Sequence, residues 1–206
     1  MKIAPQGLPY AGLLLGVGLV LIFYAPSRWV SLPFFALGVF VLYFFRDPER
    51  RAPADPRLLV SPADGTVVYA GKIPGERSGG SQVSIFLSIL DVHINRSPLS
   101  ATVDRVTYTP GRFFPAYREE ASGSNEQNEI LLKDENFEVT LRQIAGVVAR
   151  RIVCSMKPGD RVERGQRIGL IQFGSRVEVF LPDSVRLRVG RGEHVRGGET
   201  VLAERP

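Results

Sequence analysis

The chain of 206 residues contains a single cysteine, Cys154, and only two histidines, His93 and His194. One cysteine excludes an intramolecular disulfide framework and a zinc site built from thiolates. Two isolated histidines do not supply the several ligands at close spacing that a metal centre needs, so we expect no bound metal. They also leave His93 and His194 as the only imidazoles for proton transfer near neutral pH.

Acidic side chains are fewer than basic ones, 21 against 26, which gives a formal net charge of +5. Such a chain favours an anionic partner, either a lipid headgroup or a nucleic acid. No basic motif interleaved with aromatic residues for RNA is present, and the N-terminus is strongly apolar. We therefore expect an anionic membrane surface as the partner and no nucleic acid.

Two long apolar segments, residues 8–25 and 30–45, contain no charged side chain. A helix of the first segment's length spans about 27 Å, close to the thickness of a bilayer core. A short turn with Trp29 separates the two, and the cations at the outer ends predict that both ends face the cytoplasm: Lys2, Arg46, Arg50 and Arg51. We expect residues 1–52 to form a hydrophobic membrane-anchor hairpin in the cell membrane; a buried hairpin of a soluble protein is the alternative.

Beyond residue 53 the pattern becomes that of β-structure. Five stretches show alternating or β-branched residues punctuated by glycine, proline and asparagine: 58–68, 82–89, 101–108, 137–148 and 168–187. No long helical period follows them. We expect residues 53–206 to form a mainly β domain on the cytoplasmic side, with a polar loop between residues 111 and 129.

An internal repeat lies near the C-terminus, where residues 157–168 match residues 189–201. Gly159 corresponds to Gly192 and Gly165 to Gly198, each 33 positions apart. The repeated pattern resembles the barrel-sandwich hybrid folds of biotinyl and lipoyl carrier domains, which implies a barrel-sandwich-hybrid-like β domain. A membrane-tethered carrier or adaptor protein with a lipoyl-like hybrid fold is therefore an alternative function. A carrier needs a modifiable lysine between the half-motifs, and residues 168–189 contain none.

Gly174 and Ser175 together offer a second kind of chemistry. A serine hydroxyl can attack the preceding glycine carbonyl and convert the amide into an ester. β-Elimination then leaves dehydroalanine, which hydrolyses to a pyruvoyl group. A bulge glycine followed by a polar strand residue explains the same two residues without chemistry, and this pair alone leaves both readings open.

Three motifs in order narrow the choice: Ser61-Pro62-Ala63-Asp64-Gly65, then Leu90-Asp91-Val92-His93-Ile94-Asn95-Arg96-Ser97-Pro98, then Phe173-Gly174-Ser175. Behind an apolar N-terminus, this combination resembles the short (type-A, archaeal-like) form of the phosphatidylserine decarboxylase family. The resemblance covers residues 53–203 and includes residues 125–129 and 157–160.

The resemblance implies a pyruvoyl-dependent decarboxylase that converts phosphatidylserine to phosphatidylethanolamine after self-cleavage at Gly174-Ser175. The large chain would be residues 1–174 and the small chain residues 175–206. Ser175 would supply the covalent pyruvoyl cofactor, whose carbonyl receives the substrate amine and acts as an electron sink. Asp64 and His93 match the aspartate and histidine that assist maturation and catalysis in the family.

One position departs from the longer members of that family. They carry a second histidine three residues after the first, where this chain has Arg96. Either His93 takes both proton-transfer roles or another group activates Ser175. Arg96 itself is interpreted as an anion anchor or as a surface charge. The oligomeric state stays open, and a homodimer is compatible with the sequence.

Overall fold

The computed structural model describes residues 2–73, 79–116, 121–135, 137–147, 151–172 and 174–206. The chain divides into two compact units, residues 1–49 and residues 50–206. Phe173, the first residue of the third motif, lies outside the described residues.

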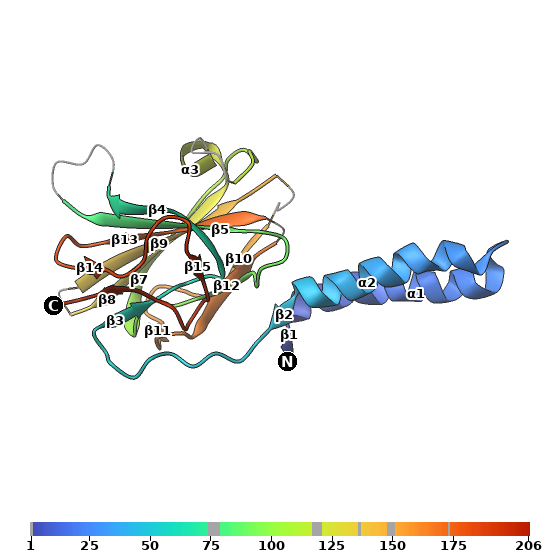
Figure 1. Ribbon diagram of the computed structural model, residues 1–206, viewed down its shortest axis with the longest axis horizontal. Coiled ribbons are helices and arrows are strands. Elements are labelled where there is room, and N and C mark those ends of the chain that lie inside the picture. Colours follow the sequence, from blue (N-terminus) through green and yellow to red (C-terminus); the bar gives the residue numbers. More distant parts are fainter. Residues whose placement is uncertain (1, 74–78, 117–120, 136, 148–150, 173) are drawn as a thin grey trace. The chain divides into compact units, whose positions relative to one another are not determined.

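The first unit is a helical hairpin closed by a small pair of strands (Figure 1). Its elements are β1 (Lys2–Ile3), η1 (Pro5–Gly7), α1 (Leu8–Tyr24), η2 (Arg28–Ser31), α2 (Leu32–Phe44) and β2 (Arg46–Asp47). Strands β1 and β2 pair antiparallel, with Lys2 opposite Asp47 and Ile3 opposite Arg46. The uncharged segments of the sequence therefore form two helices, as their length and composition predict.

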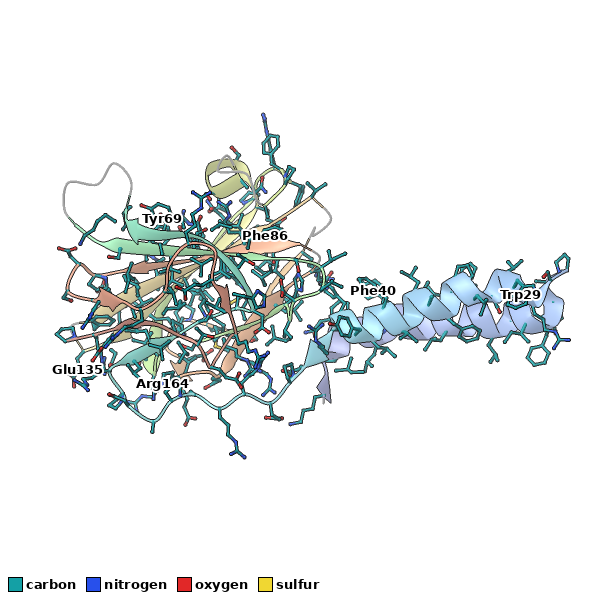
Figure 2. All side chains as sticks on the ribbon, viewed as in Figure 1. Trp29, Phe40, Tyr69, Phe86, Glu135 and Arg164 are labelled. Carbon is teal, nitrogen blue, oxygen red and sulfur yellow. The ribbon has the colours of Figure 1, made fainter. Side chains whose placement is uncertain are left out.

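Small residues allow the two helices to approach closely. A Cβ atom added at Gly18 would lie 3.2 Å from the Phe35 ring, and one at Gly38 would lie 2.7 Å from Leu15. Other apolar side chains point outward; Leu13 is 68% exposed, and Trp29, at the turn of the hairpin in Figure 2, is 77% exposed. Residues 5–24 are long and apolar enough to cross a membrane, whereas residues 28–44 form a shorter apolar helix.

The second unit is built from three antiparallel sheets (Figure 1). The strands are β3 (Leu58–Val60), β4 (Gly65–Lys72), β5 (Ser81–Leu87), β6 (Ile94–Arg96), β7 (Ala101–Thr109), β8 (Gln127–Asp134), β9 (Phe137–Ala145), β10 (Ile152–Cys154), β11 (Arg161–Val162), β12 (Arg167–Ile171), β13 (Ser175–Leu181), β14 (Arg186–Leu187), β15 (His194–Val195) and β16 (Val201–Glu204). The large sheet has the order β11-β7-β8-β9-β13-β5-β4-β15, and the small sheets are β10-β12-β6 and β14-β16-β3. One short helix, α3 (Ala121–Ser124), precedes β8.

The core lies against one face of the large sheet. Alternate residues of its central strands, such as Val83, Leu141 and Val179, are fully buried, because successive side chains of a strand point to opposite faces. Ile168 and Leu202 from the two small sheets belong to the same hydrophobic cluster. The small sheets therefore supply the other side of the core.

The sequence repeat is also a repeat of backbone conformation. Gly159 and Gly192 have φ angles of 92° and 93°, and Gly165 and Gly198 have 79° and 80°. These left-handed values favour glycine, because they cost other residues a steric clash of Cβ. The mainly β class and the apolar N-terminal helices are confirmed, whereas the barrel-sandwich-hybrid detail stays a prediction.

Three predicted boundaries were wrong. The stretch 168–187 contains three separate strands, β12, β13 and β14. The stretch 58–68 is not one strand, because the chain turns at residues 61–64 between β3 and β4. The segment 127–129, assigned to a polar loop, starts β8, which pairs with β7 and β9 along its length. Polar residues hid this strand, since half of its side chains face away from the core.

Candidate active site

Ser175 is the first residue of β13, a central strand of the large sheet. It lies between Leu87 of β5 and Ala145 of β9 in the strand register. Its side chain shares the core-facing side with Val177 and is fully buried. Its Oγ has no hydrogen-bond partner among the described residues. A buried hydroxyl without a partner is costly, so this position calls for a functional explanation.

Gly174 owes its identity to backbone conformation. Its φ angle is 65°, in the left-handed region, although a Cβ atom there would meet nothing within 4 Å. The requirement for glycine at position 174 therefore comes from the φ angle and not from a neighbouring group that needs the space. A close approach occurs at Gly146, where a Cβ atom would collide with the carbonyl oxygen of Gly174. The two glycines together set the position of that carbonyl group.

His93 contacts the same backbone segment. Its Nε2 accepts a hydrogen bond from the Gly174 N–H at 3.2 Å, and its Nδ1 lies 3.0 Å from the carbonyl oxygen of Asp91. A carbonyl oxygen only accepts, so Nδ1 carries the proton and Nε2 keeps its lone pair. The ring is 2% exposed. His93 is therefore a buried, neutral imidazole whose basic nitrogen faces the glycine before Ser175.

A tight turn holds the Asp91 carbonyl in place. The Asp91 carboxylate accepts hydrogen bonds from the Ser88 backbone N–H at 2.8 Å and from the Ser88 hydroxyl at 2.7 Å. Its other oxygen lies 3.6 Å from Nε2 of His194, a half-exposed side chain of the repeat turn. The exposed His194 side chain thus lies outside the buried site and neighbours the turn that supports it.

Asp64 lies at the same end of the large sheet. Thr66 pairs with Phe86 and Phe86 pairs with Arg176, so Asp64 is level with Gly174 two strands away. Two strand spacings amount to roughly 10 Å. Asp64 accepts hydrogen bonds from the Gly197 N–H and from Arg50, both at 2.7 Å. His93 therefore contacts Gly174, the residue bonded to Ser175. Asp64 lies at the edge of this group.

The Asp64 contact with Gly197 has a counterpart in the other half of the repeat. There, the Ser100 hydroxyl accepts a hydrogen bond from the Arg164 N–H at 3.1 Å. Arg164 corresponds to Gly197 at the same offset of 33 positions. One carboxylate oxygen of Asp64 therefore performs a turn-anchoring task that a serine performs in the sister turn, and the second oxygen pairs with Arg50.

Arg96 is not a surface charge, so that interpretation was wrong. It is 4% exposed, and its Nη1 donates to the Gly165 carbonyl at 2.9 Å. Its side chain also lies against Gly198, where a Cβ atom would approach its Cδ to 2.9 Å. Arg96 thus joins the two glycine turns of the repeat.

Several polar residues near Ser175 had no role assigned from the sequence, although Asn95 and Asn125 lie in segments that carry the family resemblance. Asn125 binds both the N–H and the carbonyl of Phe114 at 2.8 Å and donates to the Ala145 carbonyl at 2.7 Å, beside Gly146. Gln143 and Asn95 are fully buried and hydrogen-bonded to each other. The sequence did contain a signal for Gln143. This polar residue occupies an inward position between Leu141 and Ala145, where the strand pattern predicts an apolar side chain.

The described residues contain no group of three or more histidine, cysteine, aspartate or glutamate side chains that could hold a metal ion. The comparisons with known proteins place the chain among the carboxy-lyases. The model of the phosphatidylserine decarboxylase family matches residues 37–203. The chain belongs to this family, and the carrier alternative is not favoured.

Relatives match over nearly the whole chain. The phosphatidylserine decarboxylase proenzyme of Trichlorobacter lovleyi is 45% identical over 208 residues, which cover 97% of this chain and 95% of the relative. Those of Solibacter usitatus and Desulfotalea psychrophila are 44% and 41% identical and cover 100% and 99% of this chain. These relatives are described as proenzymes.

Proposed function

We propose that this protein is synthesised as a precursor, cuts its own Gly174–Ser175 bond, and then decarboxylates phosphatidylserine to phosphatidylethanolamine. The observation that carries the proposal is the buried, unpartnered Ser175 hydroxyl next to Gly174, with the basic nitrogen of His93 on the Gly174 N–H. Membership of the phosphatidylserine decarboxylase family supports the reaction, and the proenzyme relatives support the cut.

Self-cleavage begins when the Ser175 Oγ attacks the Gly174 carbonyl carbon. The Ser175 hydroxyl gives up its proton, the C–N bond breaks, and the Ser175 nitrogen takes up a proton, so an ester replaces the amide. His93 can serve as the base at this bond, because its Nε2 is unprotonated and contacts Gly174. The left-handed Gly174 and the clearance at Gly146 hold the carbonyl while the bond rearranges.

A pyruvoyl group formed from Ser175 would supply a ketone that receives the substrate amine and the electron pair released with CO₂. The residues present fit such a group: its site at Ser175 is fully buried, its flanking positions Leu87 and Ala145 are apolar, and an imidazole faces the neighbouring residue. His93 would hold and return the proton that replaces the lost carboxylate.

Asp64 acts in this proposal as a positioning residue. Its two carboxylate oxygens connect the Gly197 turn to Arg50, and Arg50 also binds Glu199 at 3.0 Å. This network closes the end of the sheet that carries Ser175. Loss of the carboxylate would release that end, which would impair maturation and turnover together.

The apolar hairpin anchors the protein in the cell membrane, with the catalytic domain on the cytoplasmic side. The support is the helix of residues 5–24, long and apolar enough to span, and the cations that flank the hairpin. An anionic bilayer surface would then present the substrate headgroup. Assembly into a homodimer is compatible with this arrangement.

An intact mass spectrum of the purified protein tests the proposal. We expect two chains, residues 1–174 and 175–206, the second with a pyruvoyl group in place of Ser175. Ser175→Ala should give one uncut, inactive chain, because alanine has no oxygen to attack the carbonyl. Ser155→Ala should be cut normally, because the Ser155 hydroxyl donates to the Ile168 carbonyl and not to the Gly174–Ser175 segment. A full-length wild-type chain that is active would contradict the proposal.

A further inference from the structure

Three carboxamide side chains form a buried hydrogen-bonded relay on the core face of the large sheet. Asn128 Nδ2 donates to Gln143 Oε1 at 3.0 Å, and Gln143 Nε2 donates to Asn95 Oδ1 at 2.8 Å. Asn128 is 3% exposed, and the other two residues are fully buried. The relay comes from three strands, β8, β9 and β6, so it links the large sheet to the small sheet that covers its core face.

The relay leaves one donor over. The Asn95 Oδ1 accepts from Gln143, whereas the buried Nδ2 of the same carboxamide has no partner among the described residues. The buried Ser175 Oγ is in the same condition. An unpaired donor and an unpaired acceptor inside one core each carry a desolvation penalty, which a contact between them would remove.

The strand register brings these two groups to one place. Gln143 pairs with Val177, so Ser175 is its diagonal neighbour on the same face, roughly 7–8 Å away. The Asn95 side chain reaches Gln143 from the covering sheet. His93 lies two residues before Asn95 and contacts Gly174. The segment 93–95 thus carries an imidazole that contacts Gly174 and a carboxamide that contacts Gln143, the diagonal neighbour of Ser175.

In the structure of the uncut chain these two atoms do not hydrogen-bond to each other. We propose that the Asn95 Nδ2–H donates a hydrogen bond to the Ser175 Oγ as the Gly174–Ser175 bond rearranges, and that it stabilises the negative charge that this oxygen acquires during maturation. This inference rests on the proposed self-cleavage. In the ester, Oγ joins the Gly174 carbonyl carbon to the Ser175 Cβ. A base removes the Ser175 Cα proton, the Cα–Cβ double bond forms, and the Cβ–Oγ bond breaks. Oγ leaves with its electron pair as part of the Gly174 carboxylate.

A donor at this oxygen acts on the elimination step in particular. Charge develops on Oγ as the Cβ–Oγ bond breaks, and a fixed donor in a buried site stabilises such charge without having to reorient. Gln143 provides that fixation, because its Nε2 donates to the Asn95 Oδ1. Removal of a comparable donor in other enzymes slows the step by about 100-fold to 1,000-fold.

The test is the maturation time course of the full-length protein, followed by intact mass with and without hydroxylamine. Hydroxylamine cleaves an ester at Gly174 and returns a small chain that begins with an intact Ser175. With the wild type, the small chain should carry the pyruvoyl group or its hydroxylamine adduct. Asn95→Leu should slow formation of the pyruvoyl chain by about 100-fold. Hydroxylamine should then release a chain with N-terminal serine.

Asn128→Leu is the matched control, because it also removes one hydrogen bond of the relay but leaves the Asn95 donor in place. It should lose thermal stability and still yield no serine-terminated chain. If Asn95→Leu does not fold, Asn95→Asp replaces it in the same time course. Its carboxylate still accepts from Gln143 but lacks the amide donor, so the same ester should accumulate.

Three outcomes overturn the inference: Asn95 variants that mature at the wild-type rate, folded variants that stay uncut and release nothing with hydroxylamine, or an Asn128→Leu protein that accumulates the same ester. A wild-type chain that is never cut would instead refute the proposed function, and the two failures are therefore distinguishable.

Discussion

The Nε2 atom of His93 accepts a hydrogen bond from the backbone N–H of Gly174, 3.2 Å away, while Nδ1 donates to the carbonyl of Asp91. The buried histidine of the chain is thereby oriented from both sides before any bond is cut. The Arg96 guanidinium, in the position of a second histidine in longer relatives, is engaged with Gly165 instead. These contacts favour His93 for both proton-transfer roles.

His93→Ala should therefore impair maturation and turnover together. We expect precursor to accumulate, and the fraction that is cut should decarboxylate about 100-fold to 10,000-fold more slowly, because a positioned acid–base group contributes that much. Gel analysis of the two chains and a CO₂ release assay measure the two effects. His194→Ala is the control, since that half-exposed ring lies outside the buried site. Wild-type processing and turnover in His93→Ala would remove His93 from the mechanism.

Gly146→Ala should slow self-cleavage, because its Cβ would push against the Gly174 carbonyl oxygen. Overpacking of this kind also destabilises a protein by roughly 1–3 kcal/mol. Gly123→Ala is the matched control: a Cβ there meets nothing within 4 Å. The half-time of precursor disappearance after a pulse label distinguishes them. Equal half-times for both variants would show that clearance at Gly146 does not set the position of the carbonyl.

Arg50 and Asp64 should behave as a coupled pair. Their side chains are each 11% exposed and their charged atoms are 2.7 Å apart, so removal of one partner breaks a buried ion pair, at a cost of about 3–5 kcal/mol. Asp64→Asn and Arg50→Gln should each lower the free energy of unfolding. The double variant should lose less than the sum of the two single losses. Denaturant unfolding of the uncut Ser175→Ala background measures this. Strict additivity would mean that the pair does not support the site.

The hairpin should resist extraction with carbonate, and its turn should face away from the cytoplasm. In a Cys154→Ser background, an impermeant maleimide added to intact cells should label Ser27→Cys in the turn. It should label Lys2→Cys at the N-terminal end only after lysis. The reverse labelling pattern would contradict the proposed sidedness, and release by carbonate would contradict insertion itself.

The sequence predicted well those features that depend on local patterns. The two helices follow from uncharged segments of sufficient length, and the glycines of the repeat follow from turns that need left-handed φ angles, as Gly159 and Gly192 illustrate. Gly174 and His93 were found as motif residues, and the structure brings them into contact.

Features that depend on contacts between distant strands were not predictable. The burial of Arg96 depends on the turn at Gly165, 69 positions away, and the relay through Gln143 depends on a covering sheet. The role of Gly146 depends on a carbonyl in a neighbouring strand. No single segment carries this information, because register and sheet order emerge only when the whole core assembles.

The placement of β13 determines what kind of molecule remains after the proposed cut. This strand lies between β5 and β9, while β15 pairs with β4 and β16 pairs with β3. The small chain is thus interleaved with the large one and cannot leave without dismantling the sheets. Before the cut, unfolding involves one molecule; afterwards it releases two. The melting temperature of the mature enzyme should therefore rise with protein concentration, whereas that of the uncut Ser175→Ala chain should not.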